Sequence, residues 1–93
     1  MFKIPRVNVI QSDEGFSVEV LGRVGVLYTE GSKSIHINSE VLNSPAGLVI
    51  VKGSIKNWDP PYDIEKIDES KRDLIVENIR RAFHFRGFEI EIN

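Results

Sequence analysis

The chain has 93 residues, 41% hydrophobic and 28% charged, with a formal net charge of −2 and no cysteine, which predicts one globular domain spanning residues 1–93. Nucleic acid is excluded as the main partner because its binding needs clustered lysine and arginine, and the missing cysteines exclude disulfides and thiolate metal sites. Because residues 1–5 lack the apolar segment of a secretory signal and no apolar run reaches the ~20 residues that span a bilayer, we expect a cytoplasmic protein without a membrane partner.

The first half of the chain alternates short apolar stretches with turn-forming residues. Regular alternation at residues 16–21 predicts a half-buried strand, whereas the alternation at residues 2–9 is broken by Pro5, which favours an edge strand. The expected strands are residues 2–9, 16–21, 26–29 and 35–38, and the expected turns are residues 11–15, 22–25 and 31–34. Because each link is short, we expect antiparallel neighbours in a meander.

The middle of the chain contains a continuous apolar run. Residues 48–51 predict a strand that is covered on both faces or central in its sheet, and this strand can continue to Ile55. The preceding residues 43–47 contain proline and glycine and are expected to form a loop. Residues 39–42 fit two alternatives, an extension of the previous strand or one irregular turn.

A strongly amphipathic helix is predicted in the last third of the chain. Either Asp68 or Ser70 can cap its start, and Gly87 suits the left-handed conformation that ends a helix. Apolar residues recur at steps of three and four, so they share one face that requires a hydrophobic sheet to pack on. These residues are Leu74, Ile75, Ile79, Ala82 and Phe83.

The end of the chain returns to strict alternation. Phe88, Ile90 and Ile92 are separated by Glu89 and Glu91, which predicts a final strand that returns to the sheet. We therefore predict an α+β fold. It consists of a mainly antiparallel sheet of about five to seven strands, with one long C-terminal helix packed on one face and the final strand after it.

No group of residues has the pattern of a catalytic or metal site. For His36 and His84 the sequence identifies neither a nucleophile nor an orienting carboxylate, so surface or capping roles are favoured. Four carboxylates between residues 59 and 68 suit a hard cation, but their spacing differs from the calcium loop and two prolines interrupt them. We expect no catalytic residue, no metal ion and no cofactor.

The segment Trp-Asp-Pro-Pro-Tyr at residues 58–62 differs from ordinary scaffold sequence. Its prolines fix φ and reduce the entropy lost on binding, and tryptophan and tyrosine are frequent among the residues that dominate interfaces. A single tryptophan in a small domain also commonly fills the core, so core plug and exposed anchor both remain open. Acidic side chains on the sheet can steer a basic partner. The residues predicted to bind a partner are Trp58, Asp59 and Tyr62, with Glu30 and Glu40 as electrostatic contributors.

One block of sequence carries a family resemblance. It runs from Ile55 through Trp58–Tyr62 and Ile67–Glu69 to Arg72, Ile75, Asn78–Ile79 and the terminal strand, and it is preceded by the strands between Gly31 and Glu40. This block resembles the immunity protein 74 family of bacterial polymorphic toxin systems, although Tyr62 stands where histidine is expected. The resemblance implies a small cytoplasmic protein that binds and neutralises a cognate toxin, without catalysis and without a cofactor.

Two other functions fit the residues. One is a protein-interaction or regulatory module outside toxin systems, such as an adaptor or a homodimer formed through an exposed sheet edge. The other is a small hydrolase or metal-dependent enzyme that uses the acidic segment 59–68. The sequence leaves the oligomeric state open.

Overall fold

The computed structural model describes residues 1–22, 25–41 and 48–93. In chain order its elements are β1 (Phe2–Arg6), β2 (Val9–Ser12), β3 (Phe16–Val20), β4 (Val26–Glu30), β5 (Lys33–Ile37), β6 (Ser39–Val41), β7 (Leu48–Ile50), the 3-10 helix η2 (Lys52–Ser54), α1 (Glu69–Phe85) and β8 (Ile90–Ile92). The loop expected at residues 43–47 and the centre of the turn expected at residues 22–25 lie outside the described residues.

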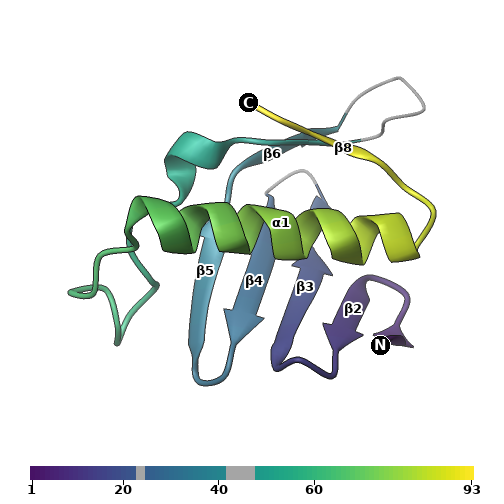
Figure 1. Ribbon diagram of the computed structural model, residues 1–93, viewed down its shortest axis with the longest axis horizontal. Helices are drawn as coiled ribbons and strands as arrows, with labels where there is room; N and C mark the ends of the chain where they lie inside the picture. The colour runs from purple at the N-terminus through teal and green to yellow at the C-terminus, as the bar shows by residue number, and fades with distance from the viewer. Residues whose placement is uncertain (23–24, 42–47) are drawn as a thin grey trace.

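Strands β1 to β5 form one antiparallel sheet in chain order, which confirms the predicted meander (Figure 1). The strands predicted at residues 16–21, 26–29 and 35–38 are confirmed as β3, β4 and β5, with ends within two residues of those expected. Tyr28 of β4 lies opposite Val18 on one side and Ile35 on the other. All three side chains are buried in one row across the face that α1 covers.

The prediction of one strand over residues 2–9 is wrong. β1 ends at Arg6, a turn at Val7 and Asn8 reverses the chain, and β2 begins at Val9. The apolar positions change from even to odd numbers between Ile4 and Val7, and one continuous strand cannot place both sets on the same face. This change of phase marks a turn. β1 is an edge strand, as Pro5 indicated.

Helix α1 begins and ends close to the predicted residues. The Asp68 carboxylate caps it by accepting a hydrogen bond from the Lys71 amide at 2.7 Å, and Gly87 follows the last turn with φ of 87°. Within the described ranges no helix is both long and apolar enough to cross a bilayer.

One residue of the predicted apolar stripe is misplaced. Leu74 is 48% exposed, whereas Val76 and Asn78 are buried. Successive helical residues are rotated by about 100°, so Leu74 lies roughly 140° around the helix from Ile79, the centre of the buried face. The helix residues that are buried are Ile75, Val76, Asn78, Ile79, Ala82 and Phe83.

The final strand is confirmed, but it joins a second sheet and does not return to the first. β7 lies at the centre of this three-stranded sheet, antiparallel to β6 and parallel to β8. All residues of β7 are buried, as the apolar run predicted, yet the strand stops at Ile50 and η2 precedes Ile55. Neither alternative for residues 39–42 matches the structure: Ser39–Val41 form β6, a separate strand of the second sheet and not an extension of β5. Leu42 lies outside the described residues.

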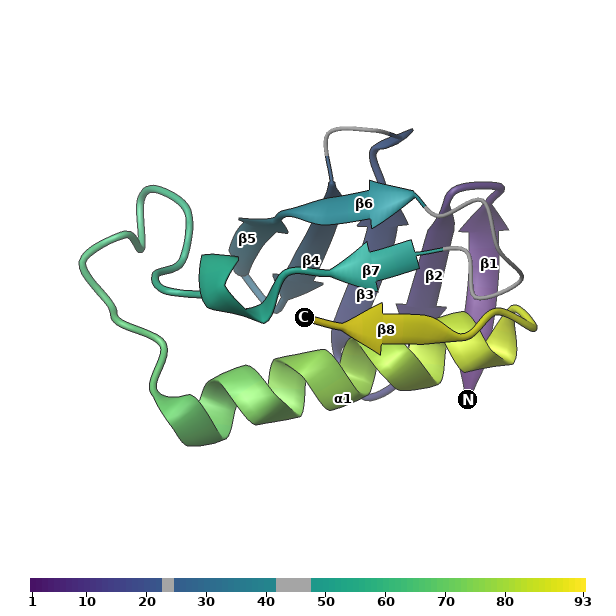
Figure 2. The ribbon, with the colours of Figure 1, turned by 90° about the horizontal axis from the view of Figure 1, so that it is seen from above.

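The core lies where the two sheets and α1 meet. Figure 2 shows the small sheet across one end of the five strands, with β8 running beside α1. Both sheets therefore contribute to one hydrophobic cluster, which confirms the α+β fold with α1 on one face of the antiparallel sheet. The largest fully buried side chains are Val18, Val26, Tyr28, Ile35, Ile37, Ile50, Ile55, Ile75 and Ile79.

Candidate functional site

The segment that links η2 to α1 extends beyond the β5 side of the molecule, as both ribbon views show (Figures 1 and 2). We name residues 56–67 the proline loop. Its two ends are joined by a bridge between Asn57 and Lys66 and by a hydrogen bond from the Ile67 amide to the Lys56 carbonyl at 2.8 Å. The loop therefore closes on itself where it leaves the domain.

Trp58 lies at the base of the proline loop and points into the core. Its side chain is 5% exposed, and its ring stacks with Tyr28 at a centroid distance of 6.5 Å. The next residue fixes the loop to the sheet, because the Asp59 amide donates a hydrogen bond to the Ser34 carbonyl at 2.8 Å. Of the two alternatives for Trp58, the structure favours the core plug, and no observation tests a contact with a partner.

Tyr62 is half-buried against the turn between β4 and β5. Its hydroxyl lies 3.1 Å from the Ser32 hydroxyl, and its ring faces the Lys33 ammonium, which is 5.6 Å from the ring centroid. The same ammonium lies 5.9 Å from the centroid of Trp58 and 2.8 Å from a carboxylate oxygen of Glu65. Lys33 thus holds the proline loop against the sheet through two cation–π contacts and one ion pair.

Asp59 also contacts a histidine on the sheet. Its carboxylate lies 2.5 Å from Nδ1 of His36, an exposed residue of β5. In the part of the chain that the structure describes, no hydroxyl is hydrogen-bonded to the other ring nitrogen of His36. The pair acts as a further link between the loop and β5.

Glu30 belongs to a hydrogen-bonded network between sheet and helix. Its carboxylate accepts hydrogen bonds from the Tyr28 hydroxyl at 2.8 Å and from the Lys71 ammonium at 2.5 Å, and the Tyr28 hydroxyl accepts from the Asn78 amide at 3.0 Å. Burial opposes ionisation of Glu30, but the bonds from Lys71 and Tyr28 outweigh it and lower the pKa of the carboxyl group. For Tyr28 the balance is the opposite, because burial of the hydroxyl raises its pKa.

The predicted binding residues do not all come together. Trp58, Asp59, Tyr62 and Glu30 gather around β5 and its turn, since Glu30 lies directly opposite Lys33 in the sheet. Glu40 is exposed on β6, where it pairs with Val49 of the other sheet.

One exposed apolar residue of the proline loop was not among the predicted binding residues. Ile64 is 89% exposed, although it is an isoleucine in a loop that is otherwise anchored on the domain. The signal was partial: Ile64 stands between Asp63 and Glu65 in a loop with two prolines, but Tyr62 and Ile67 lie at strand and helix spacing from it.

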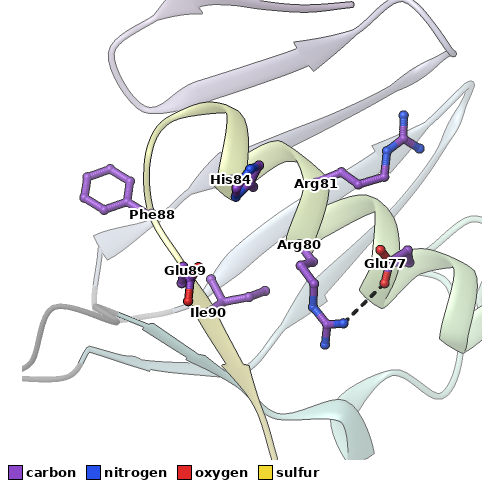
Figure 3. A pocket seen from close by; sticks show the side chains of 7 residues that line it. All are labelled: Glu77, Arg80, Arg81, His84, Phe88, Glu89 and Ile90. Carbon is purple, nitrogen blue, oxygen red and sulfur yellow. Dashed lines mark hydrogen bonds and ion pairs between the residues drawn. The ribbon is translucent and has the colours of Figure 1, made fainter.

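Two hollows lie at the other end of the molecule, around the end of α1. The larger, of about 370 Å³, is lined by Glu77, Arg80, Arg81, His84, Phe88, Glu89 and Ile90 (Figure 3). Arg80 is paired with Glu77 at 3.4 Å, and Arg81 turns away toward Glu14. Each of the two arginines is thus engaged with a carboxylate, and they do not converge on a substrate position.

The second hollow is apolar and has a volume of about 280 Å³. It lies between the β1–β2 turn and the end of α1 and is lined mainly by Val7, Ile10, Val20, Phe83 and Phe88. In the described ranges no cluster of three or more histidine, aspartate and glutamate residues is arranged to hold a metal ion.

Comparison with known proteins gives one match. A family model described as Immunity protein 74 matches residues 17–93. This span contains the proline loop, α1 and β8, which are the segments that carry the sequence resemblance. Neither the search of curated proteins nor that of solved structures found a match.

Proposed function

Because this chain belongs to the immunity protein 74 family, we propose that it binds one cognate toxin domain of a bacterial polymorphic toxin system and neutralises it. The family match over residues 17–93 carries this proposal. An immunity protein inhibits its toxin and catalyses no reaction, so the chain is not an enzyme. Its task is to form a specific and stable protein interface.

Inhibition by an immunity protein needs only that a rigid surface covers the toxin's active site or substrate groove. A standard interface of roughly 800 Å² per partner is sufficient for this purpose. The proline loop suits such an interface because Lys33, Asp59 and Tyr62 fix it to the sheet before any partner arrives. Binding then costs less conformational entropy than the ordering of a free loop would.

Within this interface we assign different tasks to the predicted residues. Asp59 and Tyr62 are partly exposed and contact the toxin directly, while Glu30 and Glu40 add negative charge that attracts a basic surface. Trp58 contributes indirectly, because its buried ring fixes the base of the loop that carries the contact residues.

Co-expression tests the function. The toxin encoded beside this gene should arrest growth when expressed alone, and the chain should restore growth and co-purify with the toxin. The proposal loses its basis if no neighbouring toxin candidate is neutralised.

Substitutions then test the assigned contacts. Asp59→Asn with Tyr62→Ala should weaken toxin binding strongly and also lower the thermal midpoint, because both side chains fix the loop to the sheet. Glu91→Gln on β8 should change neither. Circular dichroism at the assay temperature checks that the double variant stays folded. Equal binding by the double variant and the wild-type chain would contradict these contacts but leave the function intact.

One observation favours a second candidate function, self-association. The edge strand β1 and the end of α1 expose several apolar side chains at one corner: Ile4, Val7, Phe85 and Phe88. An uncovered edge beside apolar groups is a common route to a homodimer. Light scattering after size-exclusion chromatography would detect a dimer that persists on dilution, and a monomer at all concentrations would exclude it.

A further inference from the structure

The tip of the proline loop presents apolar groups to solvent. Ile64 is 89% exposed, and Pro60 and Pro61 are exposed beside it in the chain. Single exposed aliphatic residues are common on protein surfaces, so exposure alone decides nothing. The conformation and the charge of the loop distinguish this residue.

The loop is built to hold its tip in one conformation. The Tyr62 amide donates to the Asp59 carbonyl at 3.0 Å, and the Glu65 amide donates to the Tyr62 carbonyl at 3.0 Å, which makes two consecutive turns. The Asn57 side chain reaches across the loop and donates to the Asp63 carbonyl at 3.1 Å. These bonds, together with the bridge at the loop base, fix the backbone on both sides of Ile64.

The charge around Ile64 is negative. Asp63 precedes it and Glu65 follows it, and the proline loop contains three carboxylates and two lysines, with Asp68 and Glu69 following at the start of α1. Glu65 is paired with Lys33, whereas the ion pairs among the described residues do not include Asp63. The tip is therefore an apolar group with an acidic border on a rigid support.

We propose that Ile64 is the anchor residue of this chain, inserted into an apolar pocket of the toxin whose rim carries lysine or arginine side chains. The inference rests on the proposed function and names the segment and the partner surface that perform it. A rigid apolar group that leaves water completely is the usual centre of an interface, and the surrounding charges choose the partner and accelerate association.

The decisive experiment compares two substitutions that remove isomeric side chains, one in the proline loop and one in α1. Ile64→Ala truncates the loop tip, and Leu74→Ala truncates a residue of α1 that is 48% exposed. Both variants should stay folded because neither side chain belongs to the buried core. Calorimetry or surface plasmon resonance against the purified toxin domain, inactivated if necessary, gives the affinities.

We expect Ile64→Ala to raise Kd at least about 10-fold and Leu74→Ala to leave it within about 2-fold. Wild-type affinity of Ile64→Ala would overturn the inference while the proposed function stands. If the wild-type chain binds no neighbouring toxin, the proposed function fails, and the inference fails with it.

A charge substitution tests the rim of the partner pocket separately. Asp63→Lys should slow association and reduce its dependence on salt, with a smaller change in the dissociation rate. Asp63→Asn, which removes the charge but keeps the shape, should give an intermediate association rate. Faster association of Asp63→Lys would show that the rim is acidic and would overturn the assigned partner surface.

Discussion

The proline loop and the layer formed by α1 and the five-stranded sheet use apolar side chains in different ways. In the helix–sheet layer, the apolar residues of the inner faces are buried in one cluster, which includes Ile75 and Ile79 of α1 and Val18 and Tyr28 of the sheet. The proline loop places Trp58 in the same core but directs Ile64 into solvent, only six residues later. In helices and strands the apolar residues recur at regular spacing and are therefore buried on one side. An irregular loop can bury one apolar residue in the core and expose another to solvent.

Truncation of these two loop residues should give the sharpest contrast in stability. Trp58→Ala removes a buried ring and should lower the free energy of unfolding by about 3 to 5 kcal/mol, whereas Ile64→Ala should change it by less than about 0.5 kcal/mol. Denaturant melts of both variants measure the difference. Similar losses would mean that the loop does not divide its apolar residues between core and surface.

The same comparison can be made within α1. Ile79→Ala leaves a cavity between helix and sheet and should cost about 2 to 5 kcal/mol, a large share of the stability of a small domain. Leu74→Ala serves as the matched control, because Leu74 is half-exposed and should cost less than about 1 kcal/mol. A loss below about 1 kcal/mol for Ile79→Ala would contradict the packing of α1 on the sheet.

Periodicity predicted most of the fold, and its failures have physical reasons. The cap at Asp68, the stop at Gly87 and strands β3 to β5 follow from local sequence. The β1–β2 hairpin was missed because a turn without glycine or proline is visible only as a change of phase. The second sheet depends on the parallel pairing of β7 with β8, a contact between segments 40 residues apart that no local pattern reveals.

The candidate site was less accessible to sequence reasoning than the fold. Residue types identified the segment 58–62, but burial of Trp58 and exposure of Ile64 depend on how the loop closes at Asn57 and Lys66. Lys33 was missed because its cation–π contacts join β5 to residues 25 and 29 positions away. Asn78 is a polar residue, so the sequence does not predict that it lies on the buried face of α1. Its hydrogen bond to the Tyr28 hydroxyl explains why it is buried.

That buried contact offers a smaller test of the helix–sheet layer. Tyr28→Phe keeps the ring but deprives the Asn78 amide of its acceptor, which should cost about 1 to 3 kcal/mol because the donor stays buried. Asn78→Ala and the double variant complete a cycle. The double variant should lose less than the sum of the two single losses, and additive losses would mean that the bond contributes nothing.

The smallest expected effect lies where the two regions meet. Glu30 of β4 pairs with Lys33 of β5 in the sheet, and Lys33 holds the proline loop. The Glu30 carboxylate accepts a hydrogen bond from Lys71 of α1. Burial acts against its charge, yet the hydrogen bonds from Lys71 and Tyr28 lower the pKa of Glu30 from the ordinary 4.5. A carboxyl group with a lowered pKa in the folded state stabilises the protein above the unfolded pKa and loses this contribution as the pH falls through the folded value.

Stability should therefore decrease as the pH falls below about 4.5, and Glu30→Gln should show a shallower decrease than the wild-type chain. Asp13 and Glu14 also have lowered pKa values through their bonds to the N-terminal amine and to Arg81, so a residual slope in the variant is expected. Denaturant melts at pH 7 and at about pH 3.5 supply the two slopes.

Lys71→Ala should raise the pKa of Glu30, because it removes the hydrogen bond that opposes the effect of burial. An equal acid slope in wild type and Glu30→Gln would mean that the junction between loop and helix contributes no pH-dependent stability.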